Sequence, residues 1–131
     1  MRIVIPIPPR TKKNSQRIVL VKGRPIVMPS AEYKRYEKAC APFMPKFKEP
    51  IADPVNVKCL YYMPTRRRVD LTNLLEATAD LLVTYGVLAD DNRNVMYSVD
   101  GSRVFWDKDK PRTEITIEPI TEEIQRWKDD K

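Results

Sequence analysis

The sequence predicts an α+β fold, in which a small, mainly antiparallel or mixed sheet packs with two principal helices in a single domain. Three observations support this class. The chain has 131 residues, enough for one domain with its own core. Short stretches that alternate apolar and polar residues are interspersed with two stretches of helical apolar spacing. Their order is mixed and shows no internal repeat. We divide the chain into a folded domain over residues 1–120 and a polar tail or short helix over residues 121–131.

The first 50 residues predict one strand, one hairpin and one helix. Residues 2–7 alternate as a strand does. Two further strands, 18–21 and 25–28, flank the turn sequence Lys22-Gly23-Arg24 and form a hairpin. A helix begins after Ser30, whose hydroxyl is a typical N-cap. Its apolar side chains recur every three to four residues: Tyr33, Tyr36, Cys40 and Phe43.

The middle of the chain predicts a strand followed by the second helix. Residues 55–63 are rich in strand-forming residues and alternate. One face of that strand carries Val55, Val57, Cys59 and Tyr61. From Leu71 the apolar spacing becomes helical, and Gly86 supplies the C-terminal stop. The apolar face of this helix carries Leu74, Leu75, Thr78, Leu81, Leu82 and Tyr85.

Three strands are predicted after this helix. Residues 95–99 and 103–106 lie on either side of Asp100-Gly101, a sequence that favours a tight hairpin turn. Residues 113–118 form the last strand.

The charge of the chain is positive and unevenly distributed. Lys and Arg number 24 against 18 Asp and Glu, which gives a net charge of +6. The first 50 residues hold twelve basic and three acidic side chains, whereas the remainder holds twelve basic and fifteen acidic ones. Such a basic half suggests a polyanionic partner, above all nucleic acid. The alternative is a basic surface that only keeps the protein soluble.

The composition also excludes several kinds of site. The chain has no histidine, which excludes His-based triads, His proton shuttles and His zinc sites. Its two cysteines, Cys40 and Cys59, are far apart and form no CxxC pair, as is usual in a reducing cytoplasm. No apolar run approaches the roughly 20 residues that span a bilayer. We therefore expect a cytoplasmic protein whose chemistry uses carboxylates, hydroxyls, lysines or a metal held by carboxylates.

The most informative stretch is Arg66-Arg67-Arg68-Val69-Asp70. Guanidinium groups pair with phosphate oxygens, so three arginines before an acid indicate a phosphate held near a carboxylate. A structural interpretation stays open, in which Asp70 is an ordinary N-cap and the arginines form a solvated charge run.

Two further sets of polar residues could contribute oxygen ligands. Asn73, Glu76 and Asp80 share the side of the second helix away from its leucines, where they either bind a hard cation or face solvent. Asp90-Asp91-Asn92 reads as a turn, but a helix that folds back would bring these aspartates near Asp70. Carboxylates this close are stable mainly around a cation. A cation held there could polarise a phosphodiester.

These stretches resemble the RusA family of Holliday junction resolvases. The resemblance is carried by MPTRRRVDLTNL at residues 63–74 and YGVLADD at residues 85–91. The family pattern is MPxRRRxDLDNLxK, then a helix that ends in glycine and an Asp-Asp pair. Pro8-Pro9 and Lys13-Asn14-Ser15 also resemble the opening of the family, and the similarity runs from about residue 2 to residue 118.

This resemblance implies a homodimeric endodeoxyribonuclease that binds four-way junctions or branched DNA. It would make paired nicks with Mg²⁺, for which Mn²⁺ can substitute, in DNA recombination and repair. Such proteins are typically encoded by phages or prophages and act in the cytoplasm of the bacterial host.

Carried over by position, Asp70 and Asp91 are metal-binding acids, and Asp90 is adjacent. The sequence departs from the family at Thr72, where the family has an acid, and at Glu76, where it has a lysine. Our hypothesis is that Glu76 supplies the missing ligand from one helical turn along. The alternative is a junction-binding protein whose site is degenerate and inactive. A third class, a structural protein with an incidental basic face, would bind with little dependence on salt.

The remaining candidates are contacts to DNA. Residues expected to contact the backbone are Lys12, Lys13, Asn14, Arg17, Arg66, Arg67, Arg68 and Asn73. Phe105 or Trp106 either stacks on bases or packs in a core or dimer interface.

Overall fold

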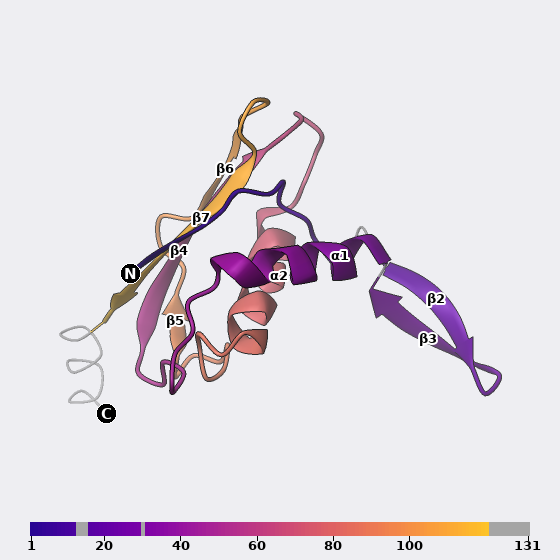
Figure 1. Cartoon of the computed structure of the whole chain (residues 1–131), viewed down its shortest axis with the longest axis horizontal. Helices are drawn as coiled ribbons and strands as arrows, with labels where there is room; N and C mark the ends of the chain where they lie inside the picture. The colour runs from indigo at the N-terminus through magenta and orange to yellow at the C-terminus, as the bar shows by residue number, and fades with distance from the viewer. Residues whose placement is uncertain (13–15, 30, 121–131) are drawn as a thin grey trace.

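Two helices cover one face of a five-stranded sheet, and a two-stranded hairpin projects from this body (Figure 1). The computed structural model describes residues 1–12, 16–29 and 31–120. The elements in chain order are β1 (Arg2–Ile5), β2 (Gln16–Val21), β3 (Arg24–Pro29), α1 (Ala31–Cys40), the 3₁₀ turn η2 (Ala41–Phe43), β4 (Val55–Met63), α2 (Leu71–Thr84), β5 (Met96–Ser98), β6 (Arg103–Trp106) and β7 (Arg112–Pro119). This is a single α+β domain, and the predicted class is confirmed.

The central strand β4 organises the sheet. It pairs antiparallel with β7, with Cys59 opposite Ile115, and β7 pairs antiparallel with β1 in turn. Alternate residues of β4 are buried against the helices, as their apolar character predicts: Val55, Val57, Cys59 and Tyr61. On its other side β4 pairs with β5 near its start and with β6 near its end, and both pairings are parallel.

The hairpin predicted around Asp100-Gly101 is therefore wrong. β5 and β6 pair with successive parts of β4, and both run parallel to it. The turn between them therefore interrupts one edge of the sheet and does not reverse the chain. Asn56 holds this break, because its side chain donates to the carbonyl of Asp100 at 3.1 Å and accepts from the N–H of Asp100 at 2.8 Å. The hydroxyl of Ser102 accepts the N–H of Cys59 at 3.0 Å. The local turn signal is satisfied, but tertiary contacts with β4 decide the direction of the next strand.

The two helices meet the sheet through a shared core. Leu74, Leu81 and Leu82 of α2 are buried there, together with Tyr33 and Tyr36 of α1. Inside this core the Tyr61 hydroxyl and the Thr78 hydroxyl share a hydrogen bond of 2.7 Å. This bond ties α2 to β4.

The end of α2 forms as the sequence indicates. Gly86 adopts a φ of +70°, a conformation that favours glycine and ends the helix. The adjacent Tyr85 hydroxyl donates to the carbonyl of Glu37 at 2.5 Å, which links this end of α2 to α1.

Part of the first helix differs from the prediction. Phe43 lies in η2 rather than in α1, and 40% of its surface is exposed. Pro42 stands at the start of η2, where its ring prevents the α-helix from continuing. Ser30 and the tail at 121–131 lie outside the described residues.

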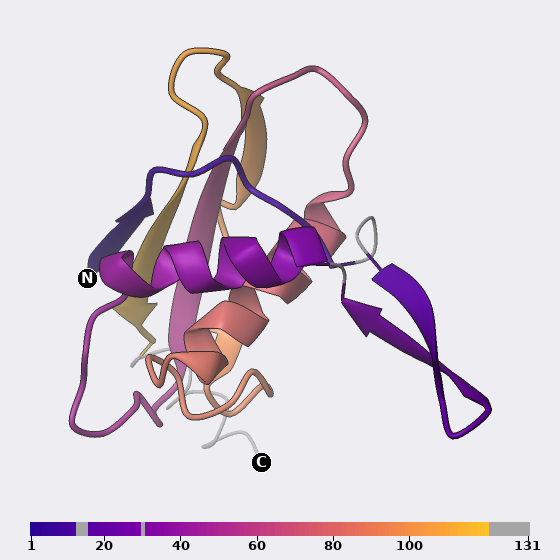
Figure 2. The same ribbon diagram turned by 45° about the vertical axis from the view of Figure 1, so that its right-hand side comes forward.

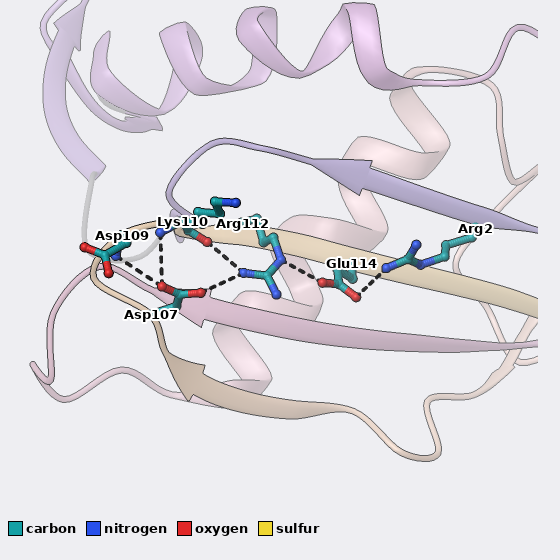
Figure 3. A network of polar contacts seen from close by, with 6 residues as sticks. All are labelled: Arg2, Asp107, Asp109, Lys110, Arg112 and Glu114. Carbon is teal, nitrogen blue, oxygen red and sulfur yellow. Dashed lines mark hydrogen bonds and ion pairs between the residues drawn. The ribbon is translucent and has the colours of Figure 1, made fainter.

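The face of the sheet away from the helices carries a chain of ion pairs (Figure 3). Arg112 bonds to Glu114 at 2.7 Å and to Asp107 at 2.9 Å, and Arg2 bonds to Glu114 at 2.8 Å. Hydrogen bonds, first from Arg2 and then from Arg112, lower the pKa of Glu114. The backbone N–H of Lys110 is the main cause that lowers the pKa of Asp107. These contacts fasten the β6–β7 turn to the sheet.

The hairpin formed by β2 and β3 is confirmed, with Lys22 and Gly23 at its tip. Both residues have positive φ, at +53° and +79°, as the two-residue turn of a twisted hairpin requires. No helix among the described residues is long and apolar enough to cross a membrane.

Candidate functional site

The connection between β4 and α2 presents the arginines and Asp70 to solvent. Its bend is held by the hydroxyl of Thr65, which accepts the N–H of Arg67 at 3.3 Å. Asp70 occupies the N-cap position with extended backbone angles of −90° and 125°, but its side chain makes no capping bond. Its carboxylate accepts from the side-chain amide of Asn73 at 3.3 Å, and it is exposed. The N-cap interpretation therefore holds for the backbone alone, and the carboxylate stays accessible.

A cavity of about 250 Å³ lies beside this connection. Its walls come from the coil after β1, the first turn of α1, the end of β4 and the connection itself: Pro9, Arg10, Thr11, Glu32, Met63, Thr65, Arg67, Arg68 and Val69. Figure 2 shows the coil after β1 and the connection on the same side of the molecule as the start of α1. Arg10 and Glu32, both in this lining, form an ion pair of 3.3 Å.

Aromatic side chains lie around the ends of β4 and β6. The guanidinium of Arg66 lies 4.1 Å from the centre of the Trp106 ring, and that of Arg112 lies 3.7 Å from the ring of Tyr62. Tyr62 stacks on Phe105 with 5.1 Å between ring centres. Trp106 is 48% exposed and Phe105 is 40% exposed, so both rings lie at the surface.

A second group of acids lies toward the C-terminal end of α2, with Asp80 in the helix and Asp90 and Asp91 in the turn that follows it. Asp90 is engaged in its own turn, because its carboxylate accepts from the N–H of Asp91 at 2.7 Å and from the side-chain amide of Asn92 at 3.1 Å. Desolvation and then the hydrogen bond with Asp90 raise the pKa of Asp91, and the charges of Asp90 and Asp80 add to this. Asp80, Asp90 and Asp91 are thus electrostatic neighbours.

The expected convergence of Asp70 with the Asp90-Asp91 turn does not appear. Asp80 follows Asp70 by ten residues, which is about 15 Å along a helix axis. Both ribbon views place the segment between α2 and β5 at the end of α2 away from its start (Figures 1 and 2). Within residues 1–12, 16–29 and 31–120, no three acidic or cysteine side chains are grouped so as to hold a metal ion. The chain does fold back after Gly86, but it then runs beside the segment that leads into β4, where Leu88 pairs with Ile51, and not toward the start of α2.

The other predicted site residues are scattered. Lys12 pairs with Asp80 at 2.5 Å and lies 5.6 Å from the ring centre of Tyr33, so its charge is already opposed by an acid. Glu76 is exposed on α2, as the polar stripe predicts. Lys13, Asn14 and the side chain of Arg17 lie outside what the structure describes.

Sequence reasoning missed Arg10, Thr11 and Glu32 as part of a site. Their available signal was weak, since Arg10 only follows a proline pair and Glu32 only stands in the first turn of a helix. Their common position depends on how the coil after β1 crosses the start of α1.

Comparison with known families now adds to this geometry. The family model described as Endodeoxyribonuclease RusA matches residues 6–118. This chain belongs to the RusA endodeoxyribonuclease family. The match contains both the arginine connection and the Asp90-Asp91 turn. A search among curated proteins found no matching relative.

Membership of the RusA family implies endodeoxyribonuclease activity on Holliday junctions. Nucleases of this family generally depend on a divalent metal and bind branched junction DNA. The basic cavity and the exposed Asp70 stand on one connection, and the Asp80–Asp91 group stands at the far end of α2. The acidic ligands that the resemblance implies are therefore divided between two places in one chain.

Proposed function

We propose that this protein resolves Holliday junctions by Mg²⁺-dependent hydrolysis of phosphodiester bonds, with paired nicks made by a homodimer in DNA recombination and repair. We further propose that it is encoded by a phage or prophage and acts in the cytoplasm of the bacterial host. The observation that carries the proposal is the RusA match over residues 6–118, which includes three arginines separated from an exposed Asp70 by one residue.

The donor set suits a hard cation. Mg²⁺ in proteins commonly takes one or two carboxylates, with waters and substrate phosphate completing the octahedron. Asp70 offers one uncapped carboxylate, and Asp91 with Asp90 offers a pair whose mutual repulsion a cation would relieve. A bound Mg²⁺ would polarise the phosphodiester and acidify the attacking water. Mn²⁺ has the same preference for oxygen ligands and would substitute.

The chain's own residues divide the remaining work. Asp70 is our first candidate ligand, because its carboxylate is exposed beside the basic cavity. Asp91 is a candidate ligand in the separate acidic group toward the C-terminal end of α2, and Asp90 chiefly holds the turn that presents it. Glu76 remains a proposed ligand in place of the family acid at Thr72, since it is exposed one turn further along α2.

The projecting hairpin supports the proposed homodimer. Ile18 and Leu20 are each 72% exposed and Val27 is 61% exposed, and the strand register places all three on one face. A two-stranded hairpin is marginally stable alone in water, so an apolar face of this kind favours a partner. A second copy offers the same face, and twofold pairing would cover both hairpins at once.

A nicking assay tests the function. A labelled four-way junction is incubated with Mg²⁺, and symmetric nicks are resolved on a denaturing gel. Asp70→Asn should lower the nicking rate at least 100-fold while junction binding is kept, and Asp91→Asn and Glu76→Gln test the other ligands. Asp53→Asn, an exposed acid outside both groups, is the matched control and should nick at the wild-type rate. Unimpaired nicking by Asp70→Asn would remove Asp70 from the site.

One observation favours a second candidate, a junction-binding protein with a degenerate site. No three-acid group is found among the described residues, and Thr72 and Glu76 stand where the family has an acid and a lysine. In this case the wild-type protein binds junctions but produces no nicks with either Mg²⁺ or Mn²⁺.

A further inference from the structure

The cavity beside the arginine connection has a strongly uneven charge. Arg10, Arg67 and Arg68 line it, and Glu32 is the only acid that the described residues contribute to its lining. Glu32 is engaged with Arg10, whereas Arg67 and Arg68 have no ion pair within the described part of the chain. Two arginines of the cavity lining thus have no acidic partner among the described residues, an arrangement that attracts an anion.

The three arginines of the motif do not share one role. The guanidinium of Arg66 lies over the ring of Trp106, outside the cavity lining, while Arg67 and Arg68 belong to that lining. Arg10 takes the third place, and it comes from a segment far away in the sequence.

The cavity wall also contains a polar group that lacks a partner. Thr11 lines the cavity and is only 4% exposed, and its hydroxyl has no hydrogen bond within the described residues. Buried hydroxyls are nearly always paired, so a group of this kind indicates a water or ligand close to the wall.

The size of the cavity limits what it can hold. Its volume of about 250 Å³ falls below the roughly 300–1,000 Å³ of pockets for drug-sized molecules. A single tetrahedral anion fits such a space, and Arg forks match its oxygens in pairs.

We propose that this cavity binds one phosphate group of the DNA backbone through Arg10, Arg67 and Arg68. The proposal rests on the proposed junction endonuclease function and assigns the point that holds the strand next to Asp70. Val69 lines the cavity and Asp70 follows it directly, so the held phosphate lies on the same connection as this acid. Glu32 competes with the phosphate for Arg10 and thereby limits affinity.

The test measures binding of a fluorescent four-way junction by anisotropy, in EDTA so that no strand is cut. Arg68→Gln and Arg10→Gln should each weaken binding several-fold and reduce the slope of log K against log salt by about 0.9. Glu32→Gln should strengthen binding several-fold, because it removes the competing carboxylate. Arg10→Gln leaves Glu32 unpaired, so the double variant with Glu32→Gln should recover part of the loss. Lys48→Gln, an exposed charge outside the cavity lining, is the matched control.

The direction in which Glu32→Gln changes junction affinity is the most decisive result for the cavity proposal. Weaker binding by Glu32→Gln, or arginine variants that match Lys48→Gln in affinity and salt slope, would overturn the proposal. If these variants bind as the control does while wild type nicks junctions, the cavity proposal fails and the endonuclease proposal stands. If the predicted pattern of binding is found but wild type does not nick, the cavity proposal stands and the endonuclease proposal fails.

A second arm separates backbone phosphate from free phosphate. Inorganic phosphate is titrated against chloride at equal ionic strength, and the guanidinium N–H signals are followed by NMR. Competition with the junction at this site supports the proposal. Shifts at Arg67 and Arg68 by free phosphate, without any effect of the variants on junction binding, would show a free-anion site and overturn it.

Discussion

The buried hydrogen bond between Tyr61 and Thr78 should control the stability of the site's scaffold. The two side chains are 1% and 3% exposed, and their hydroxyl oxygens lie 2.7 Å apart. They join β4 to α2, which are the two elements on either side of the arginine connection. A loosened bond here would free both ends of that connection.

Thr78→Val keeps the shape of the side chain but leaves the Tyr61 hydroxyl without its partner. A buried polar group left unpaired in this way costs about 1–3 kcal/mol. At about 2.1 cal/mol/K per residue, a chain of 131 residues has an unfolding entropy of about 0.28 kcal/mol/K. The melting temperature should therefore fall by about 4–11 °C.

Tyr61→Phe should cost less than Thr78→Val. The freed threonine hydroxyl can donate to a carbonyl one turn earlier in α2, so it does not stay unpaired. The double variant should then be more stable than the sum of the single effects predicts, because both partners are removed together.

Urea unfolding and thermal unfolding of wild type, the two single variants and the double variant complete this double-mutant cycle. Thr84→Val changes an exposed threonine of the same helix and should stay within about 0.5 kcal/mol of wild type. A loss below about 0.5 kcal/mol for Thr78→Val, or a larger loss for Tyr61→Phe, would contradict the reasoning.

Three further results are expected. Arg2 and Arg112 lower the pKa of Glu114 in the folded state, so the stability that ionised Glu114 contributes is complete above about pH 5 and is lost as pH falls below about 4. Glu114→Gln should therefore flatten the acid side of the profile of melting temperature against pH, and an unchanged slope argues against a stabilising role of the ion pairs of Glu114 with these arginines. Ile18→Lys should weaken self-association at least tenfold in sedimentation equilibrium, and an unaltered dimer would exclude the hairpin as its interface. Gly86→Ala should lower the free energy of unfolding, measured in urea, by about 1–2 kcal/mol, because alanine is strained at a φ of +70°. No neighbour lies within 4 Å of the added methyl group, so unchanged stability would refute this backbone strain.

Local patterns in the sequence determined most of the secondary structure. The alternation over residues 55–63 predicted β4 with its buried face, and the leucine spacing with Gly86 predicted α2 and its end. Both signals act within a few residues, through side-chain direction and backbone freedom, so they survive without tertiary information. The motif from Met63 to Leu74 likewise identified the family.

Tertiary structure alone decided which parts come together. Asp100-Gly101 encodes a turn, but pairing with β4 made β5 and β6 parallel to it, and no local signal sets that choice. Asp70 and Asp91 belong to one family pattern in sequence, yet Asp70 stands at the start of α2 and the segment that carries Asp91 lies at the other end of this helix, whose 14 residues are about 21 Å long. Arg10 and Glu32 line one cavity because the coil after β1 and the first turn of α1 both lie beside the β4–α2 connection. Such proximity depends on how distant segments pack against one another, which the spacing of residues along the sequence does not determine.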